Sequence, residues 1–435
     1  MPYLLNLVYL FIILLISPWL IYKALTTGKY RRGMGRKFWG LAWRNPDRRP
    51  CVWFHGVSVG EIHLLRPVVA RFRQRLPTWQ VVVSTTTDTG YAEAEKHFPD
   101  LPVFYWPLDF TWTVRRALRR VRPELVVLAE GEAWPNFVHS AKQQGVKIAV
   151  INGRISPRSW RHYELLGRWL PVPFPKLDLI AAQNEEYAEA YRALGVDAWR
   201  VHITGSVKFD GVTSDRHNPR TEALRQLFHV TADDIIWIAG STQTPEEEHV
   251  LAIFRQLKPH FPALRLFLVP RQRDRFDEVA GLLNRFGHPY VRRSALTDPL
   301  LEPTDLVLVD TIGELGALWG LADVAFVGGS MDGKRGGQNM LEPAAYGAAV
   351  VFGSHVWNFR HIAAQLVQAG AARQITDAAE LAKVIEQLCR DPQERQRLGS
   401  AARDYVLRQQ GATERTLDLL HGLLRTRPDP RRAAG

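Results

Sequence analysis

Cysteine is scarce in this chain of 435 residues. Only Cys51 and Cys389 are present, and they lie far apart in the sequence. Two such residues cannot supply the disulfide framework of a small secreted protein or a cysteine-based zinc site, and their scarcity suits a reducing compartment. The sequence also has no repeat with a period of about 20 to 50 residues, which argues against a solenoid or a propeller.

Acidic residues are outnumbered by basic ones. There are 44 Asp and Glu residues against 56 Lys and Arg residues, which gives a net charge of +12. This charge predicts a polyanionic partner, and nucleic acid, an anionic lipid or a phosphorylated substrate would each satisfy it. Hydrophobic residues make up 46% of the chain. Wholesale disorder is therefore excluded, and two domains with full cores are expected.

The N-terminal segment is almost free of polar residues. The apolar run at 3–22 is interrupted only by Asn6, Ser17 and Pro18. About 20 such residues can span a bilayer as a helix. Basic residues follow the run instead of preceding it, and no small-residue cleavage site is present, which argues against a signal peptide. We predict an anchor helix at 1–25 and a basic juxtamembrane segment at 26–49, with the rest of the chain on the cytoplasmic side. A buried helix of the first domain and a helix lying in the membrane interface are the alternatives.

The remaining sequence alternates between buried-strand runs and helical patterns, which is typical of α/β domains with parallel sheets. We expect strands at 52–55, 81–84, 125–129, 147–151 and 179–182, then at 235–239, 264–269, 306–309, 324–327 and 349–352. The pattern predicts an N-terminal α/β domain at 50–205, a polar linker at 206–220, a C-terminal α/β domain at 221–424 and a disordered tail at 425–435.

The turn after the first strand allows three interpretations. Gly56-Val57-Ser58-Val59-Gly60 matches the G-x-S-x-G elbow of α/β-hydrolases, with Ser58 as nucleophile. That elbow normally follows several strands, however, and no later segment suggests the His and the acid of a triad. Ser58 and Glu61 also fit a helix capping box. In the third interpretation, Glu61 is the reactive residue.

Polar residues follow other predicted strands, at the edge where open α/β sheets bind ligands. Glu130 and Glu132 follow one strand, although they also suit the N-terminus of a helix beginning near Trp134. In the second domain, Ser241 and Thr242 can bind a phosphate, and Arg271 can do so bidentately.

A glycine-rich loop connects the strand at 324–327 to a helix expected near Asn339. Its glycine pairs allow a ligand to approach the backbone closely, and the helix N-terminus favours an anion such as phosphate. Glu342 can either close a capping box with Asn339 or accept hydrogen bonds from a ribose diol.

Several of these segments carry a resemblance to one family. G-G-S at 328–330, G-G-Q-N-M-L-E-P-A-A-Y-G at 336–347 and F-G-S-H-V-W-N-F at 352–359 resemble the donor-site signature of the bacterial 3-deoxy-D-manno-octulosonic acid (Kdo) transferases. H-G-V-S-V-G-E at 55–61 resembles their acceptor-side signature. Motifs at 84–90, 130–136, 152–159, 204–210 and 310–315 follow in the family's order. The chain departs from the family at Gln338, which replaces a usual His, and at Gly131 and Gly153, which replace the more frequent Thr and Ala.

The resemblance implies a GT-B fold, with two Rossmann-like parallel-sheet domains and an N-terminal membrane-anchor helix. It implies an inverting transferase that moves Kdo from CMP-Kdo to the phosphorylated lipid A precursor at the cytoplasmic side of the bacterial inner membrane. Anionic membrane lipids are then the polyanionic partner, and nucleic acid is not expected. The alternatives are a lipid-anchored serine esterase that uses Ser58 and a sugar-nucleotide epimerase of the same fold.

The same resemblance assigns the site residues. Glu61 is the expected catalytic base, and Glu130 and Glu132 are further catalytic candidates. The acceptor candidates are Ser58, Gly60, Thr86 and Arg154. The donor candidates are Lys208, Ser241, Thr242, Pro270, Arg271, Gly313, Glu314, Gly329, Ser330, Gly337, Gln338, Asn339 and Glu342. No D-x-D-like or His-cluster motif follows a predicted strand, so we expect neither a metal nor a cofactor in the transfer.

Overall fold

The computed structural model describes residues 2–27, 33–155, 160, 163 and 172–425. The predicted tail beyond 425, part of the basic segment and residues 156–159 of the motif at 152–159 lie outside the described residues. The chain forms two compact units, Met1–Gly211 with Gln410–Gly435, and Val212–Gln409.

The first unit is built on a seven-stranded parallel sheet with the order β3-β2-β1-β4-β5-β6-β7. Its strands are β1 (Cys51–His55), β2 (Gln80–Thr85), β3 (Val103–Tyr105), β4 (Leu125–Ala129), β5 (Lys147–Gly153), β6 (Leu179–Ala182) and β7 (Val201–Ile203). The central strands β1 and β4 are buried along their whole length because helices cover both faces of the sheet. Their continuous apolar runs therefore predicted them well.

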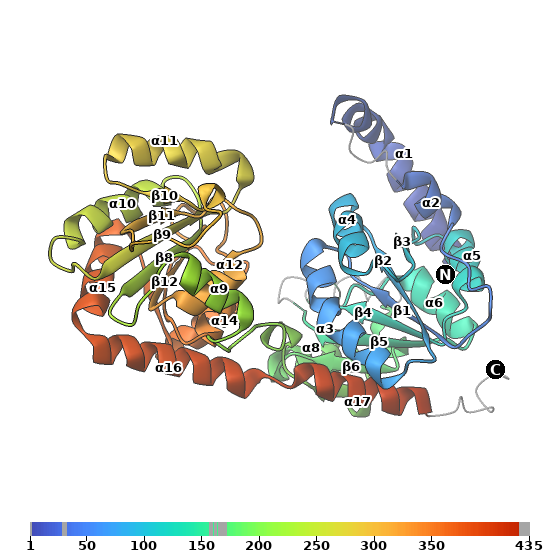
Figure 1. The fold of residues 1–435 in the computed structure, drawn as a ribbon. Helices are drawn as coiled ribbons and strands as arrows, with labels where there is room; N and C mark the ends of the chain where they lie inside the picture. The colour runs from blue at the N-terminus through green and yellow to red at the C-terminus, as the bar shows by residue number, and fades with distance from the viewer. Residues whose placement is uncertain (1, 28–32, 156–159, 161–162, 164–171, 426–435) are drawn as a thin grey trace. The chain divides into compact units, whose positions relative to one another are not determined.

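Helices connect these strands (Figure 1). They are α3 (Val59–Arg75), α4 (Asp88–His97), α5 (Thr111–Val121), α6 (Pro135–Gln143) and α8 (Glu185–Ala193), with single 3-10 turns at Phe174–Lys176, Ala198–Arg200 and Val207–Phe209. Because all strands run parallel, their carboxyl ends share one edge of the sheet, and the loops that enter these helices meet there.

The last described helix, α17 (Ala412–Arg425), belongs to the first unit. The sequence pattern predicts it in the second domain, and that prediction is wrong. The helix packs on α3 and β6 (Figure 1). Arg75 on α3 pairs with Glu414 and Asp418 on α17. Asp210 accepts hydrogen bonds from the backbone N–H groups of Gly411 and Thr413, so its carboxylate holds the start of α17.

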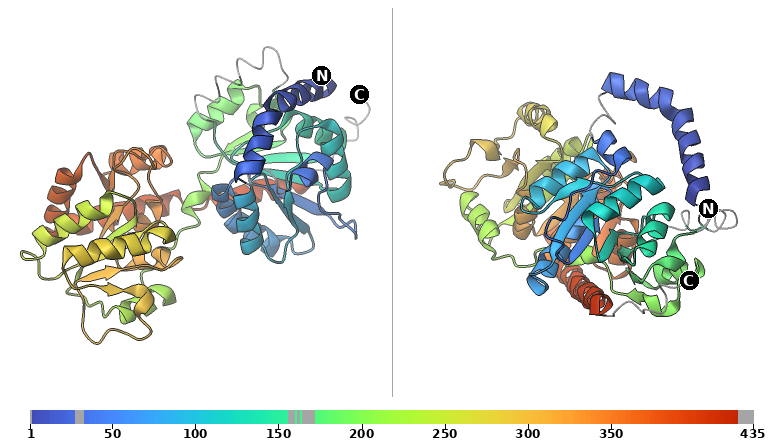
Figure 2. Two further views of the ribbon diagram at one scale, coloured as in Figure 1. Left: turned by 90° about the horizontal axis from the view of Figure 1, so that it is seen from above. Right: turned by 90° about the vertical axis from the view of Figure 1, so that its right-hand side faces the viewer.

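The apolar N-terminal segment forms α1 (Pro2–Thr27), followed by the short α2 (Met34–Trp39). The window Pro2–Trp19 is long and apolar enough to cross a membrane. Its first turns, however, pack on α5 and α6, while much of the helix projects from the unit (Figures 1 and 2). Asn6 is only 6% exposed. Its side chain donates to Thr111 Oγ1 over 2.8 Å and accepts from the Thr111 N–H over 3.1 Å.

These contacts predict a cost for removing the anchor. Deletion of residues 1–22 should lower the free energy of unfolding of the first unit by about 1–3 kcal/mol, because Thr111 and Asp109 lose the hydrogen bonds of Asn6 and Tyr9. Urea unfolding would measure the loss. Asn6→Ala should reproduce part of it, whereas Leu14→Ala, an exposed position on the same helix, should not. Equal stability of the full and truncated chains would contradict the docking of α1.

The second unit repeats the architecture. Its seven parallel strands have the order β10-β11-β9-β8-β12-β13-β14. They are β8 (Ile235–Thr242), β9 (Leu264–Pro270), β10 (Val291–Arg292), β11 (Leu306–Leu308), β12 (Val324–Val327), β13 (Ala349–Gly353) and β14 (Ala372–Ile375). The helices are α9 (Pro219–Leu227), α10 (Glu246–Leu257), α11 (Phe276–Phe286), α12 (Leu315–Leu318), α13 (Leu341–Ala345), α14 (Arg360–Gln368), α15 (Ala378–Arg390) and α16 (Pro392–Gln409), with 3-10 turns at Arg273–Arg275, Arg293–Ala295 and Trp319–Leu321. The two Rossmann-like sheets confirm the predicted fold class.

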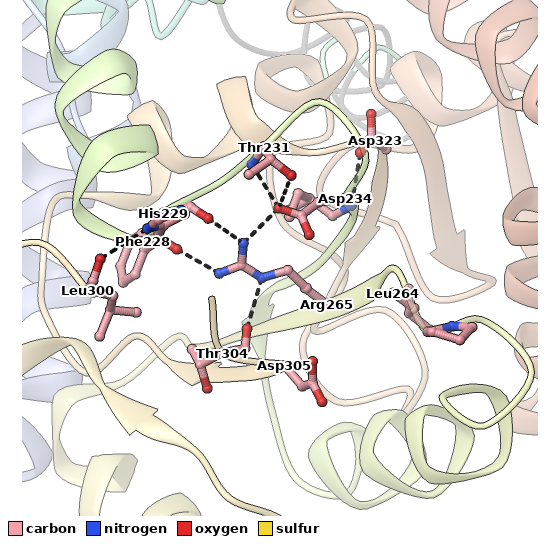
Figure 3. A network of polar contacts seen from close by, with 12 residues as sticks. Phe228, His229, Thr231, Asp234, Leu264, Arg265, Leu300, Thr304, Asp305 and Asp323 are labelled. Carbon is pink, nitrogen blue, oxygen red and sulfur yellow. Dashed lines mark hydrogen bonds and ion pairs between the residues drawn. The ribbon is translucent and has the colours of Figure 1, made fainter. Parts of the chain in front are cut away.

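A buried guanidinium fastens the amino end of this second sheet (Figure 3). Arg265, at the start of β9, is 2% exposed and pairs with Asp234 over 2.8 Å. It also donates to the carbonyl oxygens of Phe228, His229 and Thr304. Such a charge is tolerated inside a protein only when its donors are satisfied. Because this cluster lies at the edge opposite the strand carboxyl ends, we assign it to stability and not to ligand binding.

Candidate active site

Glu61 lies in the first turn of α3, directly after β1. Its carboxylate accepts hydrogen bonds from the Val57 N–H over 2.7 Å and from the Ser58 hydroxyl over 3.1 Å. Ser58 is the N-cap residue, but its side chain caps no helical N–H. The reciprocal bonds of a capping box are therefore not formed. Instead, the turn holds one carboxylate in a fixed position at the ligand edge of the sheet.

The environment of Glu61 weakens its acidity. Burial, together with the charges of the nearby Glu130 and Glu132 carboxylates, raises the pKa of Glu61 to about 7 against the opposing hydrogen bonds from Val57 and Ser58. A general base is most effective when its pKa lies near the working pH. The carboxylate is thus suited to accept a proton from a substrate hydroxyl at neutral pH.

The geometry of Ser58 does not fit a hydrolase nucleophile. Its backbone is extended, with φ −118° and ψ 168°, whereas the nucleophile elbow is a strained turn. Its hydroxyl donates to Glu61 and not to a histidine. The neighbouring His55 is buried, which lowers its pKa to about 3, and its Nδ1 contacts Ser84. The esterase alternative therefore has no support from this turn.

Glu130 follows β4 and is held by basic side chains. Its carboxylate contacts Lys208 Nζ over 2.9 Å and Arg154 Nε over 3.0 Å. The backbone of Glu130 and that of its neighbour Asn152 are both left-handed, with φ of 57° and 51°. Strained backbone of this kind is common at functional sites. Lys208, expected at the donor phosphate, thus belongs to the first unit and neutralises Glu130.

Glu132 and Thr86 complete the group in the first unit. Burial raises the pKa of Glu132. The Thr86 carbonyl accepts a hydrogen bond from Lys37 on α2. Gly60 has open space beside it, because an added Cβ would meet only Ser58 Oγ at 3.9 Å. The structure brings the catalytic and acceptor candidates together at the carboxyl ends of β1, β2, β4 and β5.

Tyr191 lies beside both departures from the family pattern, Gly131 and Gly153. A Cβ on Gly131 would lie 2.4 Å from the hydroxyl of Tyr191, and a Cβ on Gly153 would lie 3.1 Å from its ring. Tyr191 is fully buried, and its hydroxyl has no hydrogen-bond partner among the described residues. The tyrosine ring therefore fills the space that larger residues would occupy at both glycines.

This packing predicts a coupled pair of substitutions. Gly131→Ala should destabilise the first unit in the native background, and Tyr191→Phe should recover part of the loss because it removes the clashing oxygen. Residues in direct contact show coupling energies of about 0.5–3 kcal/mol in such cycles. The four unfolding free energies of the cycle measure the term. Strict additivity would contradict the packing explanation.

The donor candidates of the second unit also lie after strands that share one edge. Ser241 and Thr242 end β8, Pro270 ends β9 and precedes Arg271, Gly313 and Glu314 precede α12, and Gly329 to Asn339 follow β12. Arg271 is exposed. Burial raises the pKa of Glu342, and the Arg271 charge counteracts this rise. Glu314 instead pairs with Arg293 over 2.8 Å.

The hydrogen-bond partners of the glycine-rich loop differ from those predicted. The N–H groups of Gly329 and Ser330, predicted to face a phosphate, donate to the carboxylate of Glu246 over 2.7 and 2.9 Å. Glu246, in the first turn of α10, is fully buried and also accepts from the N–H groups of Met331 and Gln243. These amides therefore donate their hydrogen bonds to a carboxylate of the protein and not to a phosphate. Nothing in the sequence distinguished Glu246 from the two glutamates that follow it.

The helix after this loop begins slightly later than predicted. It begins at Leu341, and Asn339 precedes it with its side chain bonded to the Leu341 N–H and to Glu342. Gln338 packs near Gly329, since its Nε2 lies 3.3 Å from the position of a Cβ there. The Gly337 N–H donates to the Gly329 carbonyl. Contacts between residues of this segment therefore hold the loop in its conformation.

Comparison with known proteins identifies the family. Residues 30–211 match the family model described as "3-Deoxy-D-manno-octulosonic-acid transferase (kdotransferase)". The 3-deoxy-D-manno-octulosonic acid transferase of Haemophilus influenzae is 34% identical over 396 residues, covering 90% of this chain and 91% of the relative. That of Bordetella pertussis is 36% identical over 387 residues, covering 86% and 87%.

Solved structures support the fold. The UDP-GlcNAc 2-epimerase of Neisseria meningitidis aligns with a TM-score of 0.59 and 12% identity, covering 86% of this chain and all of that one. At this identity the likeness concerns the architecture alone. The sequence relatives, in contrast, cover nearly the whole chain at more than 30% identity. The chain therefore belongs to the 3-deoxy-D-manno-octulosonic acid transferase family of glycosyltransferases.

Proposed function

We propose that this chain transfers Kdo from CMP-Kdo to a hydroxyl of the phosphorylated lipid A precursor in a single inverting displacement. The observation that carries the mechanism is the carboxylate of Glu61, fixed by Val57 and Ser58 at the ligand edge and raised in pKa to about 7. Glu61 takes the proton of the acceptor hydroxyl while that oxygen forms a bond to the anomeric carbon. The bond from this carbon to the phosphate oxygen breaks, and CMP leaves with the electron pair.

The residues around Glu61 have supporting roles in this proposal. Burial keeps the pKa of the base high, and the negative charges of Glu130 and Glu132 add to this effect. Glu130, neutralised by Lys208 and Arg154, fixes the loop that carries Glu132. Because Lys208 already has this partner, we assign the donor phosphate to Arg271 of the second unit. No metal or cofactor enters these steps.

We further propose that the enzyme works at the cytoplasmic face of the bacterial inner membrane. Supporting this, α1 has exposed apolar side chains, among them Phe11, Leu14 and Leu15. The net charge of +12 would attract both anionic lipids and the phosphates of the acceptor.

The proposal is tested by incubating the purified full chain with CMP-Kdo and lipid A precursor. Released CMP together with the mass gain of Kdo on the lipid is the expected result. CMP release without a change in lipid mass would indicate hydrolysis and would contradict the transfer. Covalent labelling of Ser58 by a fluorophosphonate would favour an esterase instead.

Substitution of Arg271 should weaken donor binding. Arg271→Ala removes a charge-assisted contact to phosphate, so the dissociation constant of CMP should rise by roughly tenfold or more. Calorimetry on the full chain measures this constant. Arg273→Ala, an exposed arginine two residues further on, is the matched control and should leave it unchanged. Equal affinities for CMP in all three proteins would move the donor phosphate away from Arg271.

A further inference from the structure

Three potential metal ligands converge on the surface between α3 and α4. His63 comes from α3, and Glu93 and His97 come from α4. The Glu93 Oε1 atom lies 2.7 Å from His97 Nε2 and 3.5 Å from His63 Nε2. The three ligand atoms all lie within 4.8 Å of one another. The cluster thus combines two imidazoles and one carboxylate from two packed helices.

The separations of Glu93 from the two histidines are close to those in a tetrahedral zinc site, and the two imidazole nitrogens lie within 4.8 Å of each other. Zn–N and Zn–O bonds are about 2.0–2.2 Å, so ligand atoms around one ion lie about 3.3 Å apart. The separation between His63 and Glu93 already matches this value. The direct contact between His97 and Glu93 needs to open from 2.7 Å to about 3.3 Å. Side-chain rotations on partly exposed residues can supply such a shift without moving the helices.

The contact between His97 and Glu93 alone is an ordinary pair one helical turn apart. His63 makes the cluster different, because it reaches the same carboxylate oxygen from another helix and its ring packs edge-on against that of His97 at 5.1 Å. Two imidazoles that point at one oxygen form an incomplete coordination sphere in which a cation can replace the shared hydrogen bonds.

Electrostatics favours the ligating forms of His63 and Glu93. Burial lowers the pKa of His63, and the positive charges of Arg66 and Lys96 lower it further, although Glu93 opposes them. The pKa of Glu93 is also low, since the hydrogen bond from His97 and the charge of Lys96 outweigh its burial. Neutral imidazole and ionised carboxylate are the states that bind metal.

We propose that His63, Glu93 and His97 form a binding site for a divalent transition metal of the zinc class, with water completing the coordination. Imidazole and carboxylate ligands together suit zinc better than magnesium or calcium, which prefer oxygen ligands alone. The bound ion joins α3, the helix that carries Glu61, to α4. It strengthens this contact and takes no part in sugar transfer. The three ligands lie on two helices and do not directly follow a strand.

Zinc titration of the full, untagged chain tests the site. After treatment with a chelator, calorimetry at pH 7.5 should show one zinc ion bound per chain and an increase in Tm. His63→Gln and His97→Ala should each weaken this binding by at least about tenfold. His421→Ala, an exposed histidine on α17, should leave it unchanged. Circular dichroism checks that each variant is folded, and His63→Gln keeps the side-chain volume at a half-exposed position.

Cobalt(II) provides a second readout that a purely structural hydrogen bond would not affect. Visible absorption bands typical of tetrahedral cobalt should appear with the native chain and disappear with His63→Gln. Zinc binding that survives His63→Gln, or that is as weak in the native chain as in a variant with all three residues replaced by Ala, would overturn the proposal. Failure here leaves the transfer of Kdo untouched, because that reaction is measured separately through CMP release.

Discussion

Replacing Glu61 with Gln is expected to lower the rate of Kdo transfer by about 10²–10⁴-fold while CMP binding stays close to native, because Gln keeps the size of the side chain but cannot accept a proton. The amide oxygen can still accept one of the bonds from Val57 and Ser58, so the turn should remain folded. Single-turnover transfer with the full chain measures the chemical step, and calorimetry with CMP measures binding.

The matched control is Ser58→Ala, which removes one hydrogen bond to the carboxylate and no proton acceptor. Its loss of activity should be much smaller than that of Glu61→Gln. Near-normal transfer by Glu61→Gln would rule out Glu61 as the base. Complete loss in Ser58→Ala combined with an active Glu61→Gln enzyme would point to nucleophilic chemistry at the serine.

The second large effect is expected at Glu246. In the native protein, each carboxylate oxygen of Glu246 accepts hydrogen bonds from two backbone N–H groups. In Glu246→Gln, an amide NH₂ group replaces one of these oxygens. Two buried donors then lack an acceptor. At about 1–3 kcal/mol for each, the free energy of unfolding of the second unit should fall by about 2–6 kcal/mol.

Urea unfolding measures this loss, and hydrogen exchange localises it. The amides of Gly329, Ser330 and Met331 should exchange faster in Glu246→Gln. Glu248→Gln is the matched control, since Glu248 lies in the same turn of α10 but is exposed. If both variants had native stability and native exchange at the glycine loop, the carboxylate would not be the element that holds this loop.

The strands that the sequence predicted and those it missed differ in burial. β4 and β8 are buried on both faces, so their apolar runs identify them without ambiguity. β14 was not predicted because Arg373 and Gln374, in the middle of this edge strand, are exposed. An edge strand has one neighbour and one partly solvated face, and its composition therefore resembles that of a loop.

The candidate site shows a similar division. Glu61 follows a strand and precedes a helix, so its place at the sheet edge could be predicted from local pattern. Glu246 could not, because its partners Gly329 and Ser330 are distant in sequence and only the fold brings them to its carboxylate. The packing of α17 on the first unit could not be predicted for the same reason. An amphipathic pattern predicts that a face is buried but does not name the surface that buries it.

The return of α17 to the first unit makes the second unit an insertion within the first. During synthesis, the surface of α3 and β6 that receives α17 must wait until all of residues 212–409 have been translated. At about 5–20 residues per second, this wait lasts on the order of ten to forty seconds. The second unit is contiguous in sequence and can complete its core first. The N-terminal half of the chain, although made earlier, is thus the last to finish folding as it leaves the ribosome.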